Sequence, residues 1–301
     1  MLANRAIAAA LVCVLVTACG GERAADEVVV TSGSDETVAG DKSLPAIIAS
    51  EHRSADDRAR DPYRHPLETL EFFGIDAEMT VVAVWPGAGW YTEIIAPFLA
   101  AGGGTYIAAG FDPNLSGEAG QPIIREFNDR YTNSPGFYGD VKVTALSAES
   151  DGVAPAGSAD MVLTFRNVHN WLYGGFADKA FADFYAALKP GGILGVVEHR
   201  LPASAEQNAR ASSGYVHEAT VRRLAEAAGF EFVASSEINA NPADTADHPF
   251  GVWTLLPERR SSDGGTAPAD FDREAFDAIG ESDRMTLKFR KPITADGALL
   301  E

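Results

Sequence analysis

The 301-residue chain contains little cysteine and far less basic than acidic charge. Its two cysteines, Cys13 and Cys19, both lie near the N-terminus, so we expect the rest of the chain to fold without disulfide bonds. The 24 Lys and Arg residues are outnumbered by 43 Asp and Glu, which gives a formal net charge of −19. An acidic surface repels phosphate backbones, and this argues against nucleic acid as a partner.

Several catalytic motifs are also absent. The sequence has no Gly-x-Ser-x-Gly nucleophile elbow and no phosphate-binding loop ending in Gly-Lys-Ser/Thr. The six histidines form no His-x-x-x-His pair and have no cysteine partners, so we expect no metal site. A three-ligand site assembled from distant parts of the chain remains an alternative.

The N-terminus resembles the signal peptide of a bacterial lipoprotein. An apolar run from Ala6 to Val16 follows Arg5, and it is shorter than the about 20 residues that span a bilayer. Val16-Thr17-Ala18-Cys19 is similar to a lipobox, which implies removal of residues 1–18 and lipidation of Cys19. Gly20 then favours an outer-membrane lipoprotein of the cell envelope that faces the periplasm. An ordinary secretory signal cut nearby is the alternative.

The remaining sequence divides by composition. Residues 19–43 are rich in Gly, Ser, Thr, Asp and Glu, and we expect a flexible acidic tether. Residues 44–292 are sufficient for one large domain, and residues 293–301 form a tail.

Short apolar strands alternate with helices along this domain, which predicts an α/β fold with a doubly wound sheet. The predicted strands are Met79–Trp85, Thr105–Ala109, Val141–Leu146, Asp160–Phe165, Ile193–Glu198, Phe230–Ser235 and Met285–Phe289. The predicted helices cover about Leu44–Gly74, Trp90–Leu99, Gln121–Tyr131, Ala177–Leu188 and Glu218–Ala228. Residues 257–283 are predicted to be a polar excursion with one short helix.

The turn after the first strand suggests a small-molecule site. Gly87 and Gly89 allow the backbone to approach a ligand and direct the N–H groups of the next helix toward it. A dinucleotide-binding loop needs a third glycine where Thr92 stands, so a nicotinamide or flavin cofactor is disfavoured. A tight turn without a ligand is the alternative.

The strand, Gly-x-Gly turn and helix resemble the first motif of class I S-adenosylmethionine-dependent methyltransferases. Leu188-Lys-Pro-Gly-Gly192 and Ala228-Gly229-Phe230 also recur in that class. From about Ala46 to Pro292 the chain is similar to a bacterial group of predicted methyltransferases. The shared marks are Arg60-Asp-Pro-Tyr-Arg-His-Pro66, Trp85-Pro86-Gly87, Gly89-Trp90-Tyr91, Phe165-Arg166-Asn167, His169-Asn170-Trp171 and Ser282-Asp283-Arg284-Met285.

This resemblance implies a Rossmann-like sheet of seven strands, with the last strand antiparallel, and S-adenosyl-L-methionine as cofactor. It implies that Asp112 accepts the ribose hydroxyls and that Ser147 lies near the adenine ring. Asp112-Pro113 is equally typical of a turn. The implied cofactor-binding residues are Trp85, Gly87, Gly89, Asp112, Ser147 and Arg166. One position departs from the class, because Ala83 stands where an acid usually helps to hold the amino-acid end of the cofactor.

Methyl transfer needs a base only when the nucleophile carries a proton of high pKa. The candidate catalytic residues lie at the carboxyl ends of strands four and five, namely Asn167, His169 and Glu198. His169 would accept a proton near neutral pH. A structural hydrogen bond of His169 to a loop carbonyl, and an ion pair between Glu198 and Arg200, are the alternatives.

The candidate substrate pocket combines N-terminal residues with aromatic and histidine side chains near the crevice. It comprises Tyr63, Arg64, Trp90, Trp171 and His199, with Tyr173 as a further aromatic wall. For Tyr63 and Arg64, a packing corner between helices is the alternative. The resulting hypothesis is a lipid-anchored methyltransferase for a small-molecule acceptor. A catalytically silent lipoprotein of the same fold, acting as a ligand-binding or scaffold module, is the competing hypothesis.

Overall fold

The computed structural model describes residues 41–114 and 117–293. These residues belong to one compact unit. The predicted signal peptide, Cys19, nearly all of the predicted tether and the end of the tail lie outside the described residues. Within the described ranges, no helix has the length and apolar character needed to cross a bilayer.

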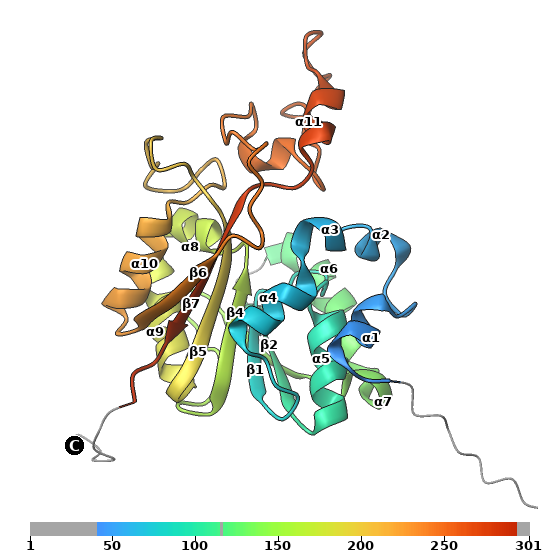
Figure 1. Cartoon of the computed structure of the whole chain (residues 1–301), viewed down its shortest axis with the longest axis vertical. Coiled ribbons are helices and arrows are strands. Elements are labelled where there is room, and N and C mark those ends of the chain that lie inside the picture. The colour runs from blue at the N-terminus through green and yellow to red at the C-terminus, as the bar shows by residue number, and fades with distance from the viewer. Residues whose placement is uncertain (1–40, 115–116, 294–301) are drawn as a thin grey trace, which may run out of the picture. The chain divides into compact units, whose positions relative to one another are not determined.

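A seven-stranded sheet forms the centre of this unit, in the order β3-β2-β1-β4-β5-β7-β6 (Figure 1). The strands are β1 (Thr80–Val84), β2 (Thr105–Phe111), β3 (Lys142–Leu146), β4 (Ala159–Phe165), β5 (Leu188–His199), β6 (Glu231–Ser236) and β7 (Arg284–Arg290). Strands β1 to β5 pair in parallel, whereas β7 is antiparallel to both β5 and β6. The predicted Rossmann-like sheet with an antiparallel last strand is confirmed.

Alternation along β1 produces a separate core on each face of the sheet. Val82 and Val84 belong to one buried cluster, and Val81 and Ala83 belong to the other. Helices α8 (Val168–Gly174), α9 (Ala177–Ala187) and α10 (Glu218–Ala227) cover the first face. Helices α1 (Leu44–Ala49), α4 (Pro66–Phe73) and α5 (Thr92–Gly102) cover the second, as Figure 1 shows.

The predicted N-terminal helical segment is divided into short helices. Helices α2 (Ala55–Arg58) and α3 (Asp61–Arg64) lie between α1 and α4. His65 separates α3 from α4 with a φ of 40°, a left-handed conformation that ends one helix before Pro66 begins the next. The other helical elements are α6 (Gly117–Phe127), the π-helix η1 (Asn128–Thr132), α7 (Pro135–Tyr138) and the 3₁₀-helix η2 (Gly251–Thr254).

Helix α8 is absent from the sequence-based prediction. It has only seven residues and follows β4 after a two-residue turn, so it offers too little periodicity to be recognised. Burial of Val168 and Trp171 against the sheet fixes it in place.

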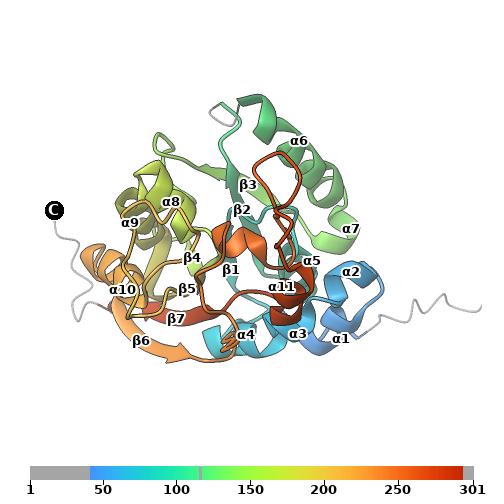
Figure 2. The same ribbon diagram turned by 90° about the horizontal axis from the view of Figure 1, so that it is seen from above.

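The polar excursion carries the one short helix that was predicted for it, α11 (Arg273–Ile279). The segment that contains η2 and α11 lies above the carboxyl ends of the parallel strands (Figures 1 and 2). Because β7 runs antiparallel to β5, Arg284 at its start pairs with His199 at the end of β5. This register brings the end of the excursion to the edge of the sheet where a ligand would bind.

Candidate functional site

A cavity of about 420 Å³ lies at the carboxyl ends of β1 and β4. Its lining includes the turn after β1, the residues after β4, His199 at the end of β5, Arg64 of helix α3, and both ends of the excursion. In doubly wound folds this edge of the sheet is where ligands bind. The cavity therefore occupies the place that the sequence predicts for a small-molecule site.

The two glycines of the turn have different roles. Gly87 has a φ of 60°, lines the cavity, and would place a Cβ in open space. A Cβ on Gly89 would lie 2.2 Å from the hydroxyl of Tyr131, and its φ is 91°. Gly87 leaves room for a ligand, whereas Gly89 leaves room for a protein side chain.

Two neighbouring strands, β1 and β4, are each followed by a residue with left-handed backbone. The φ of Trp85 is 45°, and that of Arg166 is 62°. Non-glycine residues rarely adopt this conformation, which costs on the order of 1–3 kcal/mol and is concentrated at functional sites. Both residues line the cavity.

The indole of Trp85 extends over the ends of β2 and β3. Its Nε1 donates a hydrogen bond of 3.0 Å to the Leu146 carbonyl, and its ring lies 4.7 Å from that of Phe111. Asp112 and Ser147, the predicted ribose and adenine contacts, are joined by a hydrogen bond of 3.1 Å. They lie outside the lining of the cavity. An adenosyl group bound to both residues would have to displace or share space with this indole.

Asn167 connects the ends of two strands. Its amide donates hydrogen bonds to the Val84 carbonyl at 3.0 Å and to Thr164 Oγ1 at 3.3 Å. The side chain lines the cavity, but its amide hydrogens are used by the protein. Its position indicates that it shapes the end of the site.

His169 and Glu198 form a buried pair. The Nδ1 of His169 lies 3.0 Å from Glu198 Oε1, and the amide of Val168 donates to Glu198 Oε2 at 2.5 Å. Glu198 is fully buried and lies outside the cavity lining, whereas His169 lines it. A carboxylate on Nδ1 favours the tautomer whose Nε2 accepts a proton. Glu198 therefore holds the His169 ring in place and does not itself line the cavity.

His199 is held beside this pair as a neutral imidazole. Its ring centroid lies 5.4 Å from that of His169, and its Nδ1 lies 2.6 Å from Ser282 Oγ. Burial, with further contributions from His169, Arg166 and Arg284, lowers the pKa of His199 well below 6.5. The alternative considered for Glu198, an ion pair with Arg200, is not formed, because Arg200 binds Asp283 and Glu237.

Within residues 41–114 and 117–293, one cluster of potential metal ligands is present, namely His169, Glu198 and His199. One ligand atom from each lies within 4.8 Å of the others. The oxygens of Glu198 already accept hydrogen bonds from the His169 ring and from backbone amides. The imidazoles of His169 and His199 are therefore the remaining potential ligands for a metal ion. Arg166 and Arg284 lie close enough to act on His199 electrostatically, and their positive charge disfavours a cation there.

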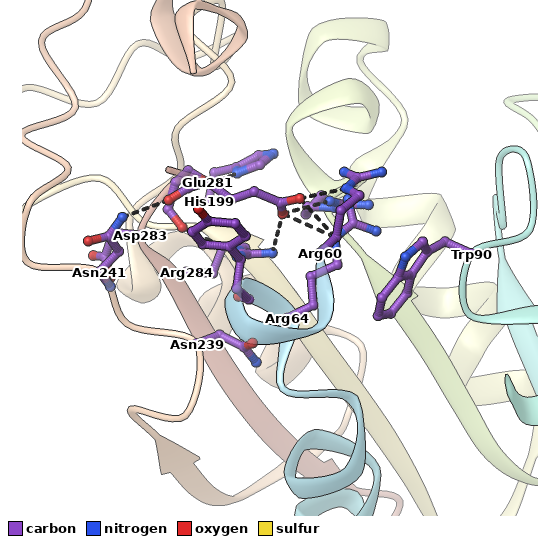
Figure 3. Close-up of polar contacts among 12 residues, drawn as sticks. Arg60, Arg64, Trp90, His199, Asn239, Asn241, Glu281, Asp283 and Arg284 are labelled. Carbon is purple, nitrogen blue, oxygen red and sulfur yellow. Dashed lines mark hydrogen bonds and ion pairs between the residues drawn. The ribbon is translucent and has the colours of Figure 1, made fainter. Parts of the chain in front are cut away.

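Glu281, from the end of the excursion, is surrounded by four guanidinium groups. Figure 3 shows Arg60, Arg64 and Arg284 converging on its carboxylate. The shortest distances from Glu281 are 2.7 Å to Arg60, 3.0 Å to Arg64, 3.1 Å to Arg284 and 3.6 Å to Arg166. We call these five residues the arginine cluster. Burial lowers the pKa of Arg166 to about 10, so its guanidinium is still charged at neutral pH.

A second acid lies on the glycine side of the cavity. Glu93, in the first turn of α5, is 1% exposed and lines the cavity. Its Oε1 pairs with Arg130, and its buried Oε2 has no hydrogen-bond partner. The sequence-based prediction did not include this residue as a ligand contact.

The predicted substrate-pocket residues are only partly brought together. Arg64, Trp90 and His199 line the cavity, and the Arg64 guanidinium lies 4.6 Å from the Trp90 ring. Trp171 is fully buried between sheet and helices, and Tyr63 and Tyr173 are exposed outside the lining. The sequence-based prediction missed Arg60, Glu281 and Ser282 as site residues. Arg60 and Ser282 belong to motifs that carry the resemblance, whereas Glu281 directly precedes one of them.

No protein-family model matches the chain, and no curated protein matches it. Among solved structures it is similar to a candidate sarcosine dimethylglycine methyltransferase from Galdieria sulphuraria. That pair is 14% identical with a TM-score of 0.51, over 78% of this chain and 86% of the other. An S-adenosylmethionine-dependent methyltransferase from Aquifex aeolicus is 18% identical, with a TM-score of 0.45 over 61% and 89% of the two chains.

Phosphoethanolamine N-methyltransferase 2 from Haemonchus contortus, solved with S-adenosyl-L-methionine, is 16% identical, with a TM-score of 0.46 over 84% and 61% of the two chains. At such identities, the likeness to the first of these structures establishes that the chain has the Rossmann-like fold of methyltransferases.

The different surroundings of the two glycines predict different costs of substitution. Gly87→Ala should lower the free energy of unfolding by about 1 kcal/mol, because an alanine at positive φ is strained but meets no atom. Gly89→Ala should cost at least about 2 kcal/mol more, because its methyl group overlaps the Tyr131 ring. Denaturant unfolding measures both. Equal losses in the two variants would contradict these roles.

The pKa of His199 predicts a pH dependence of stability. Below pH 6.5 the unfolded chain binds a proton at this residue that the folded chain does not bind. The free energy of unfolding therefore decreases as the pH is lowered below about 6.5, by at most about 1.4 kcal/mol per pH unit from this group. His199→Gln should make the decline between about pH 6.5 and 5 shallower. An unchanged slope in urea unfolding at each pH would exclude this effect.

Proposed function

We propose that the chain is an S-adenosylmethionine-dependent methyltransferase that acts on a small-molecule acceptor. The observation that carries the proposal is the cavity itself, which both Gly87 and His169 line. The fold that the chain shares with a candidate methyltransferase supports the same assignment.

Glu93 makes the cavity compatible with this cofactor in spite of Ala83. The buried Oε2 of Glu93 lacks a partner and belongs to a residue of the cavity lining, so an ammonium group would satisfy it. We infer that Glu93 holds the amino group of the cofactor in place of the missing acid at position 83.

The cofactor supplies an electrophilic methyl group when it is bound. The protein orients the acceptor against it and removes a proton from the nucleophile. His169 is the base in this proposal, because its Nδ1 is held by Glu198 and its ring faces the cavity. Transfer of the proton to Nε2 would place a cation next to the Glu198 carboxylate, which stabilises it.

A ligand-binding or scaffold module of the same fold remains the second candidate. Its specific support is the Trp85 indole, which lies over the ends of β2 and β3 beside the predicted ribose and adenine contacts. If the indole keeps this position, an adenosyl group cannot occupy the ends of β2 and β3, and the cavity would bind a different kind of ligand.

Calorimetric titration with S-adenosylmethionine distinguishes these candidates. We expect saturable binding to the wild-type chain and its loss in Gly87→Val, because the added side chain would enter the cavity. Gly157→Val is the matched control, since Gly157 has a φ of 64° and also faces open space, on an exposed loop. Glu93→Gln should weaken binding by roughly tenfold or more, as expected for a lost charge-assisted hydrogen bond.

The Trp85→Ala variant separates the remaining outcomes. Binding to wild type excludes the form of the second candidate in which the Trp85 indole keeps an adenosyl group out of the site. Absence of binding to wild type together with binding to Trp85→Ala would show that the indole closes the adenosyl site. Absence of binding to both would end the methyltransferase proposal and leave the binding module.

We also propose that the chain is anchored in the cell envelope through lipidated Cys19, most simply in the outer membrane. This proposal rests on the sequence of residues 1–20, in which an apolar segment precedes Ala18-Cys19-Gly20. A single acyl chain binds membranes weakly, so stable anchoring would need the several chains that a bacterial lipoprotein carries.

The anchoring proposal predicts a change in fractionation. Wild-type protein should sediment with membranes and accumulate as a precursor when lipoprotein signal peptidase is inhibited with globomycin. Cys19→Ser should remove both properties, and Cys13→Ser should leave them intact because Cys13 lies within the predicted signal. Wild-type protein that stays unprocessed and outside the membrane fraction would refute the anchor.

A further inference from the structure

The arginine cluster carries more positive charge than its single carboxylate can neutralise. Four guanidinium groups approach Glu281, and Arg64, Arg284 and Glu281 are at most 3% exposed. Buried charges require partners, because their desolvation is costly. The cluster is therefore short of anionic groups.

Two of these guanidinium groups have donors available. Arg64 Nη1 is buried and has no hydrogen-bond partner. The Arg166 guanidinium makes no hydrogen bond to any described residue, and its ion pair with Glu281 is long, at 3.6 Å. Both residues line the cavity. Arg284, in contrast, donates to the Tyr63 carbonyl and does not reach the cavity.

The other charges of the lining do not cancel this surplus. Glu93 is paired with Arg130, and Glu258 is exposed. Asp57 accepts a hydrogen bond from Ser54 and is only half-buried. The cavity thus has a distinct positive side, formed by Arg60, Arg64 and Arg166, and this charge also disfavours a metal cation beside His199.

We propose that the positive side of the cavity binds the carboxylate or phosphate group of the methyl acceptor, so that the acceptor is an organic anion. Guanidinium groups suit such oxyanions because they donate two hydrogen bonds in one plane. Arg166 follows β4 directly, has a left-handed backbone, and lines the same cavity as the candidate base His169. The oxyanion site stands on the geometry alone, whereas its assignment to an acceptor rests on the proposed function.

Calorimetric titration of the purified chain with inorganic phosphate and with acetate, at low ionic strength, tests the oxyanion site. Saturable binding of at least one of them to wild type is expected, with roughly tenfold or greater loss in Arg166→Gln. Arg166→Lys should retain part of the affinity, because it keeps the charge and loses the planar fork. Arg222→Gln is the matched control, since Arg222 pairs with Glu218 on α10, outside the cavity lining.

Arg166→Gln should fold normally, because it removes no hydrogen bond. Arg60→Gln provides a second test at a side chain that is 25% exposed and therefore tolerates substitution better than a buried one. The site is overturned if neither anion binds, or if wild type, Arg166→Gln and Arg60→Gln bind them equally.

Repeating the titrations with saturating S-adenosylmethionine distinguishes the source of the anionic group. Undiminished anion affinity supports the acceptor, whereas competition would assign the cluster to the carboxylate of the cofactor and overturn the acceptor assignment. If the anion binds and S-adenosylmethionine does not, the oxyanion site stands and the methyltransferase proposal fails.

Discussion

The carboxylate of Glu281 is the charge on which the arrangement of the site depends. It joins Arg60 and Arg64 of the N-terminal helices to Arg284 at the start of β7, more than 200 residues away. Removing it would leave four guanidinium groups close together without their common partner. Ser282, the next residue in the chain, forms a hydrogen bond with His199. The position of the His199 imidazole is therefore coupled to the packing of both ends of the domain around Glu281.

Much of the fold follows from local patterns. Buried strands bounded by glycine and proline, and the alternation of strand and helix, predict the parallel sheet and the two helical layers. Helix α8 escaped prediction because Val168–Gly174 is too short to show a period. The single predicted helical segment before β1 is four helices. The break between α3 and α4 lies at His65, whose left-handed conformation the hydrophobic pattern does not predict.

The candidate site could be predicted only where it depends on the ends of the strands. Gly87 lies in the turn after β1, Arg166 and His169 follow β4, and all three line the cavity, while their roles there stay predictions. Glu281 and Arg60 meet through long-range packing, which single-sequence patterns do not encode. Trp171 belongs to the motif after β4, yet helix α8 turns it into the core against Phe184. Asp112 and Ser147 follow β2 and β3, but they lie outside the cavity lining, and the Trp85 indole lies over the same strand ends.

The insertion of β7 between β5 and β6 has a consequence for the order of assembly. Five parallel strands can pair as they leave the ribosome, but the sheet is complete only when residues 284–290 have been synthesised. Glu281 and Ser282 immediately precede that strand and arrive with it. A nascent or C-terminally truncated chain would therefore have the glycine turn and the histidines but would lack Glu281 and Ser282, which line one side of the cavity. The complete binding site would form only in the final step of folding.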